Sequence, residues 1–120
     1  MDFARARLNM VEGQIRPNKV TDPRILAAML DLPRERFLPP ERRAFAYLDE
    51  DVPAAPGRAL MEPMVLARLV QAAEVLETSR VLVIAAGVGY GAALLARLAA
   101  AVVALEAPGE PAARLRAILA

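Results

Sequence analysis

The sequence contains no cysteine and no histidine, and Lys19 is its only lysine. Without cysteine the chain cannot form a disulfide, a thiolate zinc site or a cysteine nucleophile. Without histidine it lacks the most common general base and the most common protein metal ligand, and Ser-His-Asp catalysis is excluded. We therefore expect no metal site, and any catalysis by this chain must rest on positioning and electrostatics.

The charged residues nearly balance, which leaves a net charge of +1 in a chain of 120 residues that is 57% hydrophobic. This composition predicts one folded domain and argues against a disordered chain. A net charge near zero and few aromatic residues give no support for nucleic-acid binding. The N-terminus, Met1–Arg5, lacks the apolar core of a secretion signal. We expect a cytoplasmic protein, with a peripheral position on a membrane-bound complex as the alternative.

One apolar run, Val81–Leu105, carries a single charge at Arg97 and is long enough to cross a bilayer. Three glycines cluster within the run, and its β-branched residues lie at its two ends with helix formers between them. An arginine near the middle of a membrane span is costly. These features favour two short strands joined by a helix over a membrane span.

The same run has the order of a nucleotide-binding unit. Val81–Gly91 predicts a buried strand and a glycine-rich turn, Ala92–Ala100 predicts a helix, and Val102–Leu105 predicts a second buried strand that ends at Glu106. Glycines let the backbone of such a turn approach a ligand closely, and the carboxylate is placed to accept hydrogen bonds from ribose hydroxyls. This is the first half of a Rossmann-like unit. The alternatives are a tight turn with nothing bound and an exposed carboxylate at a strand end.

The remaining sequence predicts a helical region over residues 1–77, followed by the first βαβ part of the Rossmann-like domain over residues 78–120. Asp22 before Pro23 is a strong helix start, because the carboxylate caps the helix and proline fits its first turn. Leu8 and Leu69 are expected on buried helix faces. Proline and glycine positions place helices at 2–15, 23–32, 39–47, 63–77 and 111–119, with a loop over Asp49–Gly57.

Two parallel strands joined by one helix cannot bury both faces of a sheet. The chain ends within the last predicted helix, at a point where a third strand should follow. Either the sequence is the front portion of a longer protein, or a partner supplies the missing strands and covers the open faces.

Several segments resemble the N-terminal region of protein-L-isoaspartate O-methyltransferases, in matching order and spacing over nearly the whole chain. A Pro-Arg-Glu-Arg-Phe block is moderately specific for this family, whereas the glycine turn alone is weak. Arg58–Met64 is similar to an alphaproteobacterial branch. The other resembling segments are Met10–Ile15, Thr21–Leu26, Leu32–Pro39, Ala46–Tyr47, Asp49–Pro53 and the helix start at Pro63.

The resemblance implies an α/β fold, the Rossmann-like class I S-adenosylmethionine-dependent methyltransferase fold, present here in incomplete form. It implies S-adenosylmethionine as the cofactor and the carboxylate of isoaspartyl residues in damaged proteins as the methyl acceptor. In-line transfer of a methyl group from a sulfonium to a charged carboxylate needs no acid–base pair, which agrees with the lack of histidine. The residues implied to contact the cofactor are Ala85, Gly87, Gly89, Tyr90 and Glu106.

The sequence departs from the family pattern at four of its positions. Val83 stands where an acidic residue is common, Gly91 follows the motif tyrosine where a hydroxyl residue is common, and Met61 replaces a serine, so we assign no catalytic residue. Ala85 replaces the first glycine of the turn, which costs about 1 kcal/mol or more if its φ is positive.

From these departures and the open sheet we expect a protein with impaired catalysis and weakened cofactor affinity that serves as an accessory subunit of a larger assembly. The alternative is the N-terminal part of an active S-adenosylmethionine-dependent enzyme that methylates isoaspartyl-containing proteins.

Two charge clusters lie between the predicted helices. The basic cluster is suited to a substrate carboxylate or an acidic partner, and the alternative is a set of solvated helix faces that pair with Glu35 and Glu41. The acidic run Asp49–Asp51 is expected to be a solvated loop. The basic cluster consists of Arg34, Arg36, Arg42 and Arg43.

Overall fold

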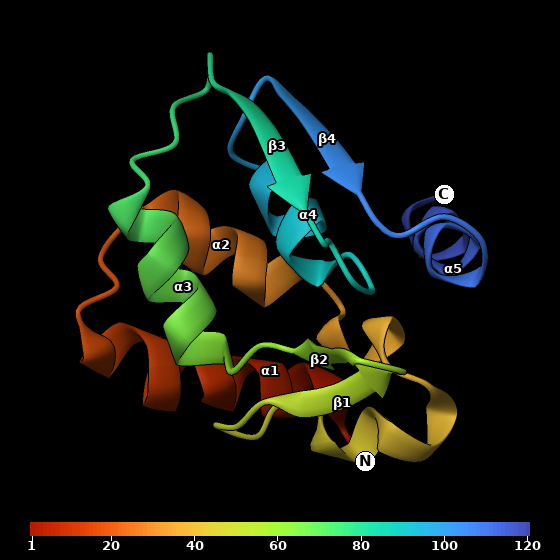
Figure 1. The fold of residues 1–120 in the computed structure, drawn as a ribbon. Helices are drawn as coiled ribbons and strands as arrows, with labels where there is room; N and C mark the ends of the chain where they lie inside the picture. Colours follow the sequence, from red (N-terminus) through yellow and green to blue (C-terminus); the bar gives the residue numbers. More distant parts are fainter.

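The computed structural model describes every residue from 1 to 120, and its central feature is a sheet of two parallel strands. Strands β3 (Arg80–Ile84) and β4 (Ala101–Leu105) lie side by side, and helix α4 (Tyr90–Ala96) connects them (Figure 1). The predicted strand–helix–strand order is confirmed, and the fold is Rossmann-like and incomplete. None of the helices combines the length and the apolar character that a membrane span requires.

Helix α4 ends four residues before the predicted end at residue 100. The register of the sheet explains this, because Ala101 must pair with Arg80 and the backbone N–H of Ala100 donates to the carbonyl of Ser79 at 2.9 Å. The chain therefore leaves the helix early in order to enter β4 in register.

One face of the sheet is open to solvent. The register pairs Leu82 with Val103 and Ile84 with Leu105, so these four side chains project from the same face. Their exposed fractions are 55%, 56%, 73% and 49%, respectively, whereas Val81 on the opposite face packs against the core. The prediction that two strands cannot bury both faces is confirmed.

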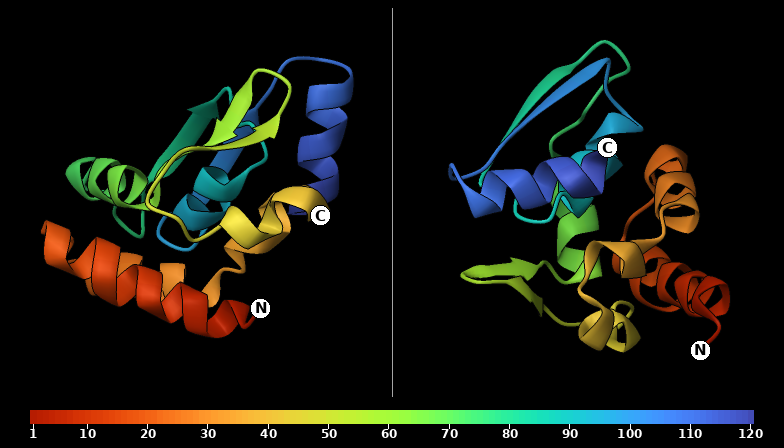
Figure 2. Two further views of the ribbon diagram at one scale, coloured as in Figure 1. Left: turned by 90° about the horizontal axis from the view of Figure 1, so that it is seen from below. Right: turned by 90° about the vertical axis from the view of Figure 1, so that its right-hand side faces the viewer.

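The helices α1 (Phe3–Met10), α2 (Pro23–Asp31) and α3 (Pro63–Ala72) pack together below the sheet, and α5 (Glu110–Leu119) lies on the opposite side of the molecule from α3 (Figures 1 and 2). The chain continues from α1 through a π-helical turn and a 3-10 turn, so the predicted helix 2–15 is one rod of changing pitch. The Asp22 carboxylate accepts a hydrogen bond from the Arg24 backbone at 2.9 Å, which confirms the predicted start of α2.

Residues 34–45 form two short 3-10 helices, Arg34–Phe37 and Pro40–Phe45. The second of these takes the place of the helix predicted at 39–47 and links the helical layer to the hairpin described next.

The prediction of a loop over Asp49–Gly57 is wrong for Val52–Ala55, which form a strand. Strands β1 (Val52–Ala55) and β2 (Arg58–Leu60) form an antiparallel hairpin there, and Gly57 turns the chain with a φ of +69°. Proline and alanine have low strand propensity, which hides the strand in the sequence. The hairpin forms because alternate residues, Val52 and Ala54, are buried in the core.

Two helix predictions also need correction. Helix α3 ends at Ala72, five residues before the predicted end. Glu74 then adopts a φ of +52°, a conformation that is incompatible with a right-handed helix. Leu8 and Leu69, which the helix patterns place on buried faces, are 48% and 55% exposed. The end of α3 is instead anchored by Gln71, whose side-chain oxygen accepts hydrogen bonds from the backbones of Thr21 (2.8 Å) and Asp22 (3.0 Å).

Candidate functional site

The glycine-rich turn lies at the carboxyl end of the sheet, where ligands of open parallel sheets bind. It follows β3 directly, and the backbone N–H of Ala86 donates to the carbonyl of Leu105 at 2.9 Å. This bond ties the turn to the end of β4 and places it beside Glu106. The two sequence features that predicted a nucleotide site are thus brought together in the structure.

Glu106 makes four hydrogen bonds through its carboxylate. Oε2 accepts from the backbone N–H of Gly87 at 2.7 Å and from Nε of Arg58 at 2.9 Å. Oε1 accepts from a terminal nitrogen of Arg58 at 2.7 Å and from the backbone N–H of Ala107 at 2.8 Å. The Glu106 side chain is only 1% exposed. The hydrogen bonds from Arg58, with those from Ala107 and Gly87, lower the pKa of Glu106 to about 2.

Arg58 reaches this carboxylate from the start of β2, 48 residues earlier in the chain. The two residues line a cavity of about 220 Å³ together with Gly87, Ala107 and Arg114 of α5, among others. Sequence reasoning placed Arg58 only within a resembling segment and assigned it no role, because nothing local to β2 signals a partner so distant in sequence.

Ala85 has a φ of +56° and is exposed. Its Cβ is disfavoured in this left-handed conformation, which glycine adopts freely, at a cost of about 1–2 kcal/mol. The backbone thus keeps the shape of a glycine turn although the first glycine is absent.

Gly87 and Gly89 both have positive φ, at +63° and +93°, but their surroundings differ. A Cβ built on Gly87 would meet nothing closer than the Arg58 side chain at 3.8 Å. A Cβ on Gly89 would lie 2.8 Å from Leu115 and 3.0 Å from Leu119 of α5. Gly89 is therefore required for packing against α5, whereas Gly87 faces the cavity beside Glu106.

Tyr90 lies in the core rather than in the cavity. Its side chain is 1% exposed, its ring contacts Phe37 edge-on with centroids 5.3 Å apart, and the Arg34 guanidinium lies 4.8 Å from its centre. Any part that Tyr90 takes in ligand binding must come from its backbone or from the packing that it fixes.

Arg34 is fully buried, so neither interpretation of the basic cluster holds for it. It donates to the carbonyls of Ala46 (2.6 Å) and Met61 (2.8 Å). Burial lowers the pKa of Arg34, although an arginine stays charged at neutral pH. Glu35 forms an ion pair with Arg7 at 3.2 Å and accepts a hydrogen bond from the Tyr47 hydroxyl. It does not pair with the arginines of the basic cluster.

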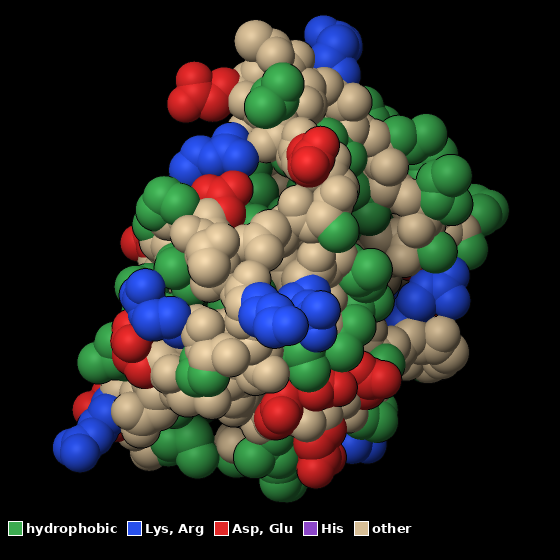
Figure 3. Space-filling model, turned by 90° about the vertical axis from the view of Figure 1, so that its left-hand side faces the viewer, with side chains coloured by type: hydrophobic (Ala, Val, Ile, Leu, Met, Phe, Trp, Pro, Cys, Tyr) green, Lys and Arg blue, Asp and Glu red, His purple; other side chains and the backbone are tan.

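The acidic run Asp49–Asp51 is exposed and lies outside helices and strands, as predicted, and Asp51 reaches the start of α3. The backbone N–H of Glu62 donates to Asp51 at 2.7 Å, and the neighbouring Asp49 carboxylate raises the pKa of Glu62. Figure 3, which views the molecule from the left-hand side of Figure 1, shows one group of acidic side chains at the lower right and others scattered at the left and top. No group of acidic side chains is arranged to hold a metal ion. Met61, in the position where the family carries serine, is 39% exposed.

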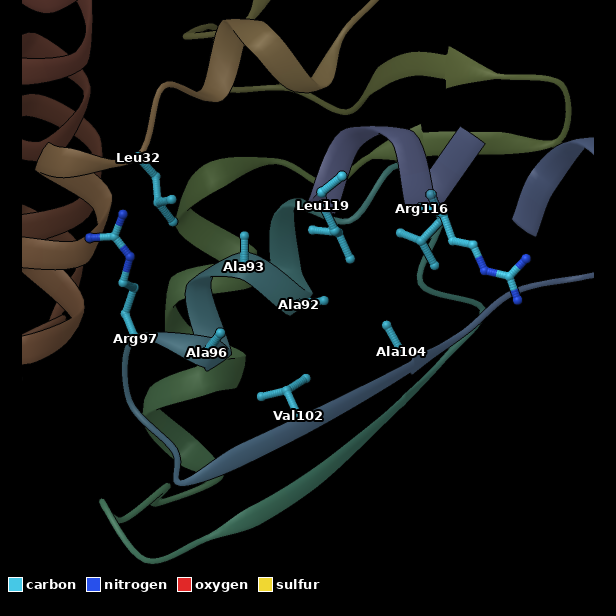
Figure 4. Close-up of a pocket in the computed structure, with 11 residues that line it drawn as sticks. Leu32, Ala92, Ala93, Ala96, Arg97, Val102, Ala104, Arg116 and Leu119 are labelled. Atoms are coloured by element: carbon cyan, nitrogen blue, oxygen red, sulfur yellow. The ribbon is translucent and has the colours of Figure 1, made fainter. Parts of the chain in front are cut away.

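A larger cavity, of about 580 Å³, lies between α4, β4 and α5 (Figure 4). Its walls are almost entirely apolar, formed by side chains such as Val102, Ala104 and Leu119, with Arg97 and Arg116 at its margin. None of the predicted cofactor residues lines it. The cavity beside Glu106 is therefore the candidate functional site, because only there do polar groups and the glycine turn converge.

Comparison with known proteins gives one consistent result. Residues 6–108 match the sequence model of the family described as protein-L-isoaspartate(D-aspartate) O-methyltransferase. The chain is 42% identical over 118 residues to protein-L-isoaspartate O-methyltransferase 1 of Rhodopseudomonas palustris strain HaA2, covering 98% of this chain and 48% of the relative. It is 43% identical over 114 residues to the protein-L-isoaspartate O-methyltransferase of Methanoregula boonei, covering 95% of this chain and 52% of the relative.

Solved structures agree on the fold. One protein-L-isoaspartate O-methyltransferase superposes with a TM-score of 0.79 at 23% identity, covering 94% of this chain and 38% of that one. A β-aspartate methyltransferase from Plasmodium falciparum, in complex with S-adenosyl-L-homocysteine, superposes with a TM-score of 0.74 at 17% identity. The match covers 94% of this chain and 54% of that one. The structure is thus part of the class I methyltransferase fold, and the chain spans about half the length of the curated relatives it matches. The chain belongs to the protein-L-isoaspartate O-methyltransferase family.

Proposed function

We propose that this chain forms the cofactor-binding half of an S-adenosylmethionine-dependent methyltransferase that acts on isoaspartyl carboxylates in proteins. The observation that carries the proposal is the meeting of Gly87 and Glu106 at the carboxyl end of the parallel sheet, joined by a 2.7 Å hydrogen bond. The names of the curated relatives indicate the reaction. A cytoplasmic location agrees with this role and stays a prediction.

The acceptor at the site, the Glu106 carboxylate, suits the ribose hydroxyls of the cofactor. A carboxylate at the end of the second strand accepts hydrogen bonds from sugar hydroxyls, and the open side of Gly87 leaves space next to it. The cavity of about 220 Å³ is smaller than the 300–1,000 Å³ that is typical of a complete small-molecule site. The described residues therefore fit the ribose part of the cofactor and form one wall of its site.

The methyl transfer needs no general acid or general base from this chain. S-adenosylmethionine supplies a methyl group on a positively charged sulfur, and the acceptor is a carboxylate that is already ionised. Orientation of the two reactants is then the main contribution of the protein. Within this chain, Glu106 and the backbone at Ala85 and Gly87 hold the nucleoside side, while Gly89 and Tyr90 fix the turn against α5 and the core.

A second candidate is an accessory subunit that retains the fold with little cofactor affinity. Two observations favour it: the strained φ of Ala85 and the valine at position 83, where an acidic residue is common in the family. The two candidates differ in one measurable property, which is binding of the cofactor.

Isothermal titration of the purified protein with S-adenosylmethionine and S-adenosylhomocysteine separates them. The enzyme proposal predicts a micromolar dissociation constant, which corresponds to about −8 kcal/mol, and loss of binding in Glu106→Gln. Methylation of an isoaspartyl peptide would then be measured. A folded protein that shows no binding at millimolar ligand contradicts the enzyme proposal and favours the accessory role.

A further inference from the structure

The carboxylate of Glu106 has no free position for a ligand. A carboxylate offers about four lone-pair sites. Here two are taken by the backbone N–H groups of Gly87 and Ala107, and the other two by the Arg58 guanidinium. With an exposed fraction of 1%, the Glu106 side chain cannot accept a further donor unless one of these groups leaves.

Arg58 is the group that can leave. Its side chain is 37% exposed, and it stands at the start of β2 next to the turn at Gly57. Its only other hydrogen bond runs to the carbonyl of Gly57 at 3.1 Å. The two backbone donors cannot withdraw without dismantling the glycine turn and the end of β4. Displaced into solvent, the guanidinium remains hydrated, and Glu106 keeps both backbone bonds.

We propose that Arg58 is a latch that competes with the ribose for Glu106, closing the nucleoside site in the free protein and swinging outward when the cofactor binds. The inference rests on the proposed function, since it requires a ribose at Glu106. It assigns to Arg58 a role in setting cofactor affinity. The bidentate fork matches the carboxylate, and it occupies the positions that two vicinal sugar hydroxyls need.

Removing the latch should tighten binding. Without Arg58, the Glu106 carboxylate is free before the ligand arrives, so no binding energy is lost in breaking the ion pair. A larger fraction of the protein is then competent to bind the cofactor. For a partly exposed, bidentate pair we expect Arg58→Gln to lower the dissociation constant for S-adenosylhomocysteine about three- to tenfold. Arg58→Lys keeps the positive charge but loses the bidentate geometry of the guanidinium. Its dissociation constant should lie between those of the unmodified protein and Arg58→Gln.

Arg116 provides the matched control. It lies on α5 outside the cavity beside Glu106, is exposed and makes no ion pair. Arg116→Gln therefore removes one positive charge and leaves the Glu106 pair intact, and it should change affinity less than twofold. Adenosine and 2′,3′-dideoxyadenosine form a second control, because Arg58→Gln should improve binding only of the ligand that has both hydroxyls.

The test is isothermal titration of the unmodified protein and the three variants with these ligands, after circular dichroism has shown that each is folded. Tighter binding in Arg58→Gln, with binding to Arg116→Gln unchanged, supports the latch, as does binding that appears only in Arg58→Gln. Equal or weaker binding in Arg58→Gln, with the unmodified protein binding well, overturns the latch alone. Absence of binding in all folded variants overturns both the latch and the proposed cofactor site.

Discussion

Ala85 carries the most evident backbone strain in the site, at a φ of +56°. Replacing it with glycine relieves the contact between its Cβ and the backbone but adds flexibility to the unfolded chain. We expect Ala85→Gly to raise the free energy of unfolding by about 1 kcal/mol, measured by urea denaturation.

Ala86 is the matched control for this change, since it lies next in the chain and has no positive φ. Ala86→Gly gains nothing from relief of strain and should lower the free energy of unfolding by up to about 1 kcal/mol. If Ala85→Gly loses as much stability as Ala86→Gly, the turn does not hold Ala85 in the left-handed conformation.

Glu106 links stability to pH. Its pKa in the folded protein is about 2, below the value of about 4.3 for an unperturbed glutamate. The folded state therefore binds the proton less readily than the unfolded state, and the stabilisation is complete above about pH 4.5. It is lost as the pH falls from there toward 2.

Denaturation of the protein and of Glu106→Gln at pH 5 and pH 2.5 checks this linkage. Asp22 and Glu35 also have lowered pKa values and contribute to the acid loss in both proteins. The difference between the two proteins isolates Glu106, and it should shrink at the lower pH. A constant difference would mean that the carboxylate is not paired in the folded state.

At the scale of elements, Arg34 joins three parts of the fold. It binds the carbonyl of Ala46 after the second 3-10 helix, the carbonyl of Met61 before α3, and the ring of Tyr90 at the start of α4. Arg34→Ala removes the donor to the buried carbonyl of Ala46 and to the carbonyl of Met61 and leaves a cavity, so we expect a loss of about 3 kcal/mol or more in unfolding free energy.

Arg36, two residues along the same 3-10 helix, is exposed and serves as the control for Arg34. Arg36→Ala should change the unfolding free energy by no more than about 0.5 kcal/mol. Thermal denaturation of both variants gives the comparison, and similar losses would show that the burial of Arg34 does not matter for stability.

The elements differ in how far their sequences predict them. The βαβ unit is predictable because β-branched residues, glycines and helix formers follow one another within 25 residues, and its parallel pairing places Glu106 beside the turn. The β1–β2 hairpin cannot be predicted in this way, because Pro53 and Ala54 have low strand propensity and form a strand only through burial. The role of Arg58 depends on a partner 48 residues away, and that of Arg34 on partners as distant in the chain as Tyr90, which no local pattern encodes.

At the scale of the whole molecule, the open sheet face determines how residues 1–120 behave alone. Leu82, Ile84, Val103 and Leu105 form an apolar surface beside two unpaired strand edges, and such surfaces promote association. We expect residues 1–120, expressed alone, to self-associate in light-scattering measurements. Ile84→Lys, at the most exposed of the four positions, should lower the apparent mass, whereas Leu8→Lys on α1 should not.

Glu106 also gives the molecule a spectroscopic reporter. Its carboxylate is shared by the hairpin through Arg58, by the glycine turn through Gly87 and by the end of β4 through Ala107. An amide proton that donates to a carboxylate at 2.7 Å resonates far downfield in a proton spectrum, and it shifts when the charge or the neighbours of that carboxylate change. The chemical shift of the Gly87 amide proton should therefore change in a different way for each of three events: protonation of Glu106, departure of Arg58 and binding of a sugar. No added label is needed to observe it.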